Sequence, residues 1–175
     1  MIDAPGRETP RFPQIQEPVA RDALSGLLAR LDAGPDDLAV SSAACGGDLL
    51  FAEAALQRGV PLEIYLPFDS ATFAEKSVDF ADRDWHARFE AACTAGSLHL
   101  MPLERPALAA SEDPYEQVNL WMLEAAARFG TDKIDFICLW NGRGGDGPGG
   151  TQHLMQEVER RRGRSHWIDT TQLWS

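Results

Sequence analysis

The sequence predicts a Rossmann-like, three-layer α/β/α domain with a mainly parallel sheet of about five strands. Short apolar runs alternate along the 175 residues with single helical segments. Strands that are joined by one helix each form right-handed βαβ crossovers, and such crossovers build a parallel sheet. A chain of this length suits one domain, and neither an internal repeat nor a linker divides it.

The N-terminal arm, residues 1–17, is expected to be extended, because prolines punctuate it and it has no hydrophobic periodicity. A single domain then covers residues 18–175. Its first helix is predicted at residues 19–31, where leucines share one stripe, and Gly34 and Pro35 end it.

The middle of the chain alternates predicted strands with predicted helices. The apolar runs that indicate strands lie at residues 38–42, 62–66 and 98–101. The helices expected after the first and second of these runs cover residues 49–58 and 84–95.

The second half of the chain contains the strongest signals. Asp113 and Pro114 are expected to cap and begin a helix that Gly130 ends. The continuous apolar run at residues 134–140 predicts a central strand that is buried on both faces. The last predicted elements are a helix at residues 152–161 and a short strand at residues 166–168.

The composition limits the classes of partner and cofactor. A net charge of −11 argues against a nucleic-acid or anionic-membrane partner, and no apolar run is long enough for a transmembrane helix. The three cysteines form no CxxC, and the four histidines have no metal-ligand spacing, so no metal or other cofactor is expected. The GxGxxG, GxxxxGK[ST] and GxSxG fingerprints are absent. A cytoplasmic setting fits this cysteine usage best.

The first candidate binding loop, residues 44–48, follows a predicted strand, and parallel sheets bind ligands beyond the carboxyl ends of their strands. Its small residues lead into a helix whose free N–H groups suit an anion. Asp48 is interpreted either as the cap of that helix or as the acceptor for a ribose hydroxyl. Cys45 is a weak candidate nucleophile, because no histidine is close in sequence. The candidate ligand-binding residues here are Ala44, Cys45, Gly46, Gly47 and Asp48.

The second candidate loop, residues 141–151, is the stronger signal, because it holds six of the fifteen glycines. Thr151 is expected to cap the next helix and to cradle a phosphate together with two glycines, and Arg143 is expected to be a mobile charge partner. A plain surface loop is the alternative. The candidate residues are Asn141, Arg143, Gly149, Gly150 and Thr151, with Asn119 of the preceding helix either exposed or near the cleft.

Two carboxylates are candidates for catalysis. An N-glycoside hydrolase or a deoxyribosyltransferase-like enzyme needs a carboxylate beneath the sugar, where it stabilises an oxocarbenium-like transition state. Glu53 and Asp48 are the candidates for that role, although Glu53 either points to solvent or faces the cleft.

Two motifs resemble the SLOG superfamily. Ser-Ala-Ala-Cys-Gly-Gly-Asp at residues 42–48, with the Ala-rich helix and Gly59 that follow, is similar to the SLOG signature. Residues 148–151, Pro-Gly-Gly-Thr, are similar to the Pro-Gly-Gly-x-Gly-Thr motif of the LOG phosphoribohydrolases. The resemblance covers residues 18–170, and it implies a Rossmann-like domain that binds a nucleotide-derived ligand.

Departures from the family favour binding over catalysis. His153 stands two positions after Thr151, where LOG enzymes have a glutamate. The resemblance also implies a strand before the first helix, so either the true start lies upstream or the domain was cut from a larger signalling protein.

We therefore expect a nucleotide-derivative binding or sensing domain in a signalling system. A nucleotide N-glycosidase and a protein-interaction module with a vestigial pocket are the alternatives. A homodimer through exposed edge strands, or fusion to other signalling domains, is compatible with this expectation.

Overall fold

A computed structural model describes residues 1–8, 10–81, 84–144 and 150–174 of the chain. It confirms the predicted α/β class, because the described residues form five strands that alternate with helices and pair only in parallel. The strands are β1 (Ala39–Ser41), β2 (Leu62–Leu66), β3 (Ser97–Leu100), β4 (Asp135–Trp140) and β5 (Arg164–Asp169). The helices are α1 (Glu17–Arg30), α2 (Gly47–Gln57), α3 (Ser70–Ser77), α4 (Trp85–Ala95), α5 (Met101–Glu104), α6 (Pro114–Ala127), α7 (Thr151–Arg160) and α8 (Thr170–Leu173).

The strands form two sheets instead of one. The first sheet has the order β1-β2-β3, and the second consists of β4 and β5. The prediction of a central strand at residues 134–140 is therefore wrong, since β4 pairs with a strand on one edge only and Cys138 is its one buried residue. The apolar run reflects packing on both faces, with Ile137 against the main core and Phe136 against α7.

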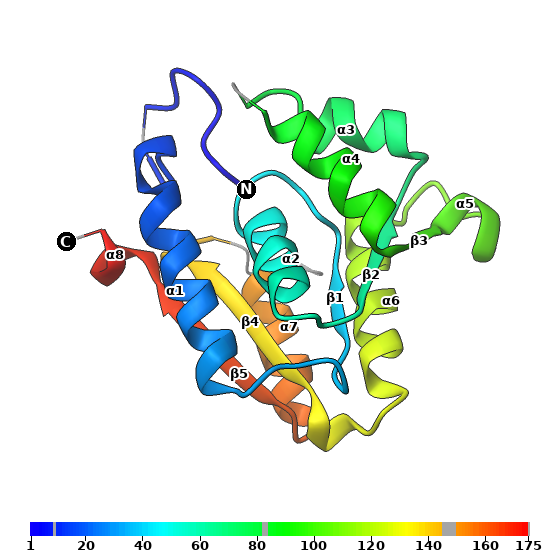
Figure 1. Ribbon diagram of the computed structural model, residues 1–175. Coiled ribbons are helices and arrows are strands. Elements are labelled where there is room, and N and C mark those ends of the chain that lie inside the picture. The colour runs from blue at the N-terminus through cyan, green and yellow to red at the C-terminus, as the bar shows by residue number, and fades with distance from the viewer. Residues whose placement is uncertain (9, 82–83, 145–149, 175) are drawn as a thin grey trace.

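Helices cover both faces of the strands, as expected for three layers. On one side, α1 and α2 pack together over a core that also receives Leu139 of β4 and Ile168 of β5. On the other side, α6 packs on β2 through Val118 and Trp121, and α7 packs on β4. Figure 1 shows α1 and α2 in front of β4 and β5, with α7 behind them. No helix in the described part of the chain is long and apolar enough to span a membrane.

The N-termini of the helices are of two kinds, with and without a side-chain cap. The carboxylates of Asp69, Asp113 and Asp169 accept backbone N–H groups at the starts of α3, α6 and α8, and the Asp113 cap was predicted. By contrast, Gly46 and Gly150 precede α2 and α7 and provide no side-chain cap. The helices after both candidate loops therefore lack a side-chain cap at the N-cap residue, and in α2 the Leu49 N–H donates to the carbonyl oxygen of Ala44 at 3.2 Å.

The N-terminal arm packs into the core. Ile2 and Phe12 are buried, and the Ile2 N–H donates to the carbonyl oxygen of Cys45 at 3.0 Å. The arm closes on itself because the Asp3 carboxylate accepts the N–H groups of Arg11 and Phe12, both at 2.8 Å. The arm is thereby fixed against the loop between β1 and α2.

Replacing Gly46 by alanine should destabilise the protein by about 1–3 kcal/mol. Gly46 has φ 101°, and a Cβ there would lie 2.5 Å from the backbone nitrogen of Ile2. Urea unfolding measures the loss, and limited proteolysis should show a released arm. Gly34→Ala is the control, because a Cβ at Gly34 meets its nearest neighbour at 3.9 Å. Equal stabilities of the two variants would contradict this account.

Candidate functional site

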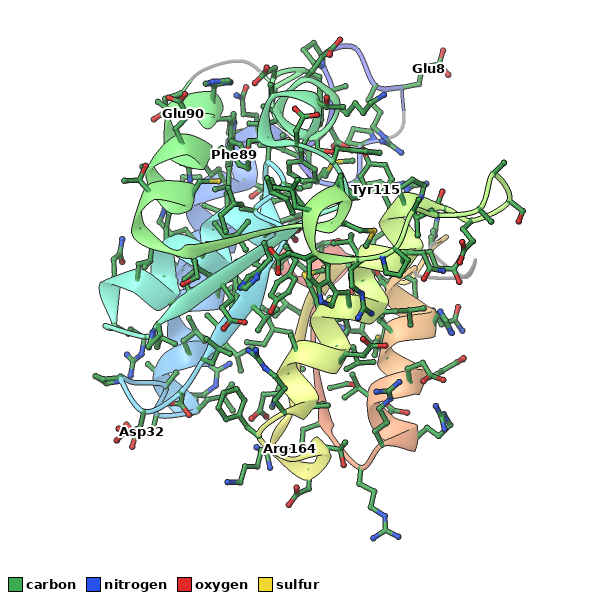
Figure 2. The ribbon with its side chains drawn as sticks, turned by 90° about the vertical axis from the view of Figure 1, so that its right-hand side faces the viewer. Glu8, Asp32, Phe89, Glu90, Tyr115 and Arg164 are labelled. Carbon is green, nitrogen blue, oxygen red and sulfur yellow. The ribbon has the colours of Figure 1, made fainter. Side chains whose placement is uncertain are left out.

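Both predicted loops lie at the edge of the molecule where the parallel strands end. The loop after β1 meets β4, because a Cβ on Gly47 would lie 3.7 Å from the Cβ of Leu139. The arm lies at the same edge, and Figure 2 shows Glu8 of the arm at the end of the molecule opposite Asp32 and Arg164. This edge is the one at which parallel α/β proteins bind ligands.

The first loop is largely covered by the arm. Ala44, Cys45 and Gly46 are buried, and the Cys45 N–H donates to the carbonyl oxygen of Ser77 at 3.0 Å. The Cys45 carbonyl oxygen accepts from Ile2, so both backbone groups of Cys45 are used inside the protein. The structure thus assigns this loop an internal contact that the sequence did not indicate.

Asp48 does not cap α2, which corrects the first interpretation of this residue. Gly46 is the N-cap, and Asp48 lies one residue inside the helix. Its exposed carboxylate accepts the Ser42 hydroxyl at 2.5 Å. The pair of Ser42 and Asp48 presents polar oxygens at the ligand edge, a chemistry that suits a hydroxyl group.

The second loop is described up to residue 144 and again from residue 150, so Gly149 lies outside the described residues. The Asn141 side chain accepts the Arg143 N–H at 3.0 Å, and Trp140 Nε1 donates to the Arg143 carbonyl oxygen at 3.3 Å. Gly142, at φ 72°, packs against the Trp167 ring. These contacts fix the first part of the loop on β4 and β5.

The start of α7 differs from the prediction in one detail. Gly150 is the N-cap, and Thr151 is the first helical residue instead of the cap. The first turn of α7 contains no acidic residue, whereas the first turn of α2 contains Asp48. The N-terminus of α7 therefore suits an anion better than that of α2.

Two arginines place positive charge beside the second loop. Arg143 belongs to the loop, and the Arg11 guanidinium lies 3.7 Å from the position of a Cβ on Gly144. Both residues are exposed, and no described carboxylate pairs with either guanidinium. Arg11 was not among the binding residues that the sequence predicted. A basic residue in the Pro-rich arm of a protein with net charge −11 was the signal that could have indicated it.

Glu53 belongs to an ion-pair network within the core layer. Its carboxylate accepts Nε and Nη2 of Arg88 at 2.6 and 2.8 Å, and Arg88 Nη1 also donates to Glu17 at 2.9 Å. The Arg88 guanidinium lies 3.9 Å from the centre of the Trp85 ring. These contacts join α1, α2 and α4. Of the two carboxylates considered for catalysis, Asp48 is the one with an exposed side chain at the ligand edge, where it accepts the Ser42 hydroxyl.

The cysteines and Asn119 are the remaining candidates from the sequence. Burial raises the pKa of the Cys45, Cys93 and Cys138 thiols to about 11, so they are protonated near neutral pH and are poor nucleophiles. Asn119 is half-buried on α6, next to the buried Val118.

Two hollows lie near these elements. One of about 220 Å³ lies between the arm and Ala81, and its lining includes Ile2, Asp3 and Arg7. The other, about 450 Å³ and open, lies along β5 and α8, where Trp167 and Leu173 line it. No described residue of the two candidate loops lines either hollow.

Comparison with known proteins shows no family. No family model matches the chain, and no curated protein matches it. A solved structure, described as cystathionine beta-synthase from Bacillus anthracis, is similar with a TM-score of 0.31 and 13% sequence identity. The match covers 88% of this chain and 64% of the other.

Glu53→Gln should destabilise the fold by about 1–3 kcal/mol, because it removes the charge that holds Arg88 between three helices. Urea unfolding measures the change. Glu75→Gln makes the same chemical change at an exposed position of α3 and should have an effect near zero. Equal effects at the two positions would show that the network adds no stability.

The three cysteines should react slowly with a thiol reagent at a pH of about 8, since burial keeps them protonated. Chemical unfolding should release all three at once. Fast labelling of Cys45 in the folded protein would contradict the packing of the arm over its loop.

Proposed function

We propose that this protein binds a small nucleotide-derived anion at the carboxyl-end edge of its strands and acts as a sensing domain in a signalling system. The observation that supports this proposal most is the placement of Arg11 and Arg143 beside the second loop. Because the whole protein has a net charge of −11, two exposed guanidinium groups that no described carboxylate pairs with form a local exception.

The phosphate would bind between these arginines and the start of α7. The helix dipole favours a negative charge there, Gly150 offers no side-chain cap, and no acidic side chain in the first turn opposes it. Arginine adds paired N–H donors that match the geometry of a phosphate. Thr151, as the first helical residue, offers a hydroxyl at the same place.

The sugar would bind near Ser42 and Asp48. A phosphate is disfavoured there by the Asp48 charge, whereas a ribose hydroxyl can donate to the carboxylate. The two ends of the edge thus differ in charge, as the two ends of a nucleotide do. This division is the reason for proposing a nucleotide derivative over inorganic phosphate alone.

Arg11→Ala combined with Arg143→Ala should weaken nucleotide binding about tenfold or more, because two charge-assisted hydrogen bonds are lost. Isothermal titration calorimetry with AMP, ADP-ribose and cyclic nucleotides measures the affinities. The control, Arg30→Ala, removes one exposed charge at the end of α1, away from the ligand edge. Failure of the wild-type protein to bind any of these ligands would refute the proposal.

Asp48→Asn tests whether the sugar and the phosphate bind at different ends of the proposed site. The loss of an acceptor for the ribose should weaken AMP binding, whereas binding of inorganic phosphate should stay the same or improve slightly. An equal loss for both ligands would contradict the assignment of Asp48 to the sugar, because inorganic phosphate contains no ribose.

A further inference from the structure

The outer edge of β5 is a strand edge without a neighbour among the described residues. Figure 1 shows β5 at the margin of the second sheet, with β4 on its inner side. We propose that a second copy of this chain pairs there, β5 against β5 in antiparallel direction, so that the two-stranded sheets of both copies join into one four-stranded sheet.

The direction of the backbone groups follows from the pairing with β4. The Arg164 N–H donates to the carbonyl oxygen of Ile134 at 2.8 Å, so Arg164 faces β4. Backbone groups of a strand alternate between its two edges, and therefore those of Ser165, Trp167 and Asp169 face outward. An unpaired row of this kind is a template for strand addition.

The second sheet is small, because it consists of β4 and β5 among the described residues. Its faces are stabilised by packing against helices, whereas the outer edge of β5 remains able to accept a strand. Joining two copies gives each β5 a neighbour on both edges and leaves β4 at the outside. Such a pairing uses the same surface of both copies, as in most homodimers.

Symmetry limits the register to a few positions. A twofold axis perpendicular to the sheet keeps the helix layers of both copies on the same sides, and it can pass beside His166, Trp167 or Ile168. With Trp167 on the axis, each Ser165 pairs with Asp169 of the second copy, which uses all three outward residues. The backbones of the two Trp167 residues then lie opposite each other at the centre, while each ring, 48% exposed, stays in contact with Trp140 of its own copy.

The charges along β5 suit this antiparallel arrangement. The strand follows a basic run and ends with Asp169. Arg160 and Arg161 of this run pair with Glu157, and Arg164 pairs with Asp135, whereas no described carboxylate pairs with the exposed Arg162. Antiparallel pairing places the basic beginning of one strand beside the acidic end of the other. Local attraction therefore opposes the repulsion between two chains of net charge −11.

The open hollow along β5 is consistent with a surface that receives another chain. It is lined by Trp167, Ile168 and Leu173 together with Asp169 and Gln172, and thus by the edge itself and by α8. The Trp167 ring is held by Trp140, with ring centres 5.7 Å apart, and by its Nε1 bond to the Trp140 carbonyl oxygen. An aromatic side chain that is already fixed loses little entropy on association.

Trp167→Lys and Trp167→Glu test this interface by analytical ultracentrifugation. The wild-type protein should be a dimer, and each variant alone should dimerise about a hundredfold more weakly, because like charges meet on the axis. Mixing the two variants should restore a heterodimer, a result that misfolding cannot give. Phe129→Lys is the control, since Phe129 is 57% exposed at the end of α6.

Cysteine cross-linking tests the register. Trp167→Cys should form a disulfide-linked dimer under mild oxidation, because residues opposite each other in a hydrogen-bonded pair lie about 5.5 Å apart. Ser165→Cys alone should not cross-link, but it should do so when mixed with Asp169→Cys. A monomeric wild-type protein at about 1 mM, or a dimer that Phe129→Lys disrupts and the Trp167 variants do not, would overturn the proposal.

Discussion

The contact between Gly46 and the N-terminal arm is the constraint on which the rest of the ligand edge depends. Only a residue without a side chain allows the backbone of Ile2 to approach so closely and adopts φ 101° without strain. The contact buries Ile2 and fixes the turn that Asp3 closes. The same turn places Arg11 beside the second loop. The steric requirement at Gly46 therefore determines that a positive charge lies next to Gly144.

The helix layer over the strands is held by a second, electrostatic constraint. Arg88 binds carboxylates from α1 and α2 while it belongs to α4, and its planar guanidinium also packs on Trp85. A charge so little exposed is tolerated because several acceptors share it. This arrangement explains why Glu53, a polar residue in an apolar helix, need not belong to the ligand site.

The strands of this domain are divided between two sheets, and helices join the two sheets. The arrangement leaves β1 and β4 each with a single strand neighbour, and β5 with an outer edge that carries Trp167. The helices on both sides bridge the two sheets through side-chain packing, since Ile137, Leu139 and Ile168 join the core around α1 and α2. Stability across the division thus depends on apolar burial and not on a hydrogen-bonded ladder.

Local chemistry in the sequence determined the α/β class, the strand at residues 62–66 and the start of α6 at Asp113, because hydrophobic periodicity and capping act between near neighbours. It also singled out the two glycine loops. The sequence did not indicate α3, α5 or α8, which are short and have weak periodicity. Tertiary structure alone decided that Gly46 receives Ile2, that Glu53 binds Arg88, that Arg11 reaches the second loop and that β4 lacks a second strand. Each of these outcomes depends on residues that are distant in the sequence. Which of these residues become neighbours is decided only when the layers of helices and strands pack together.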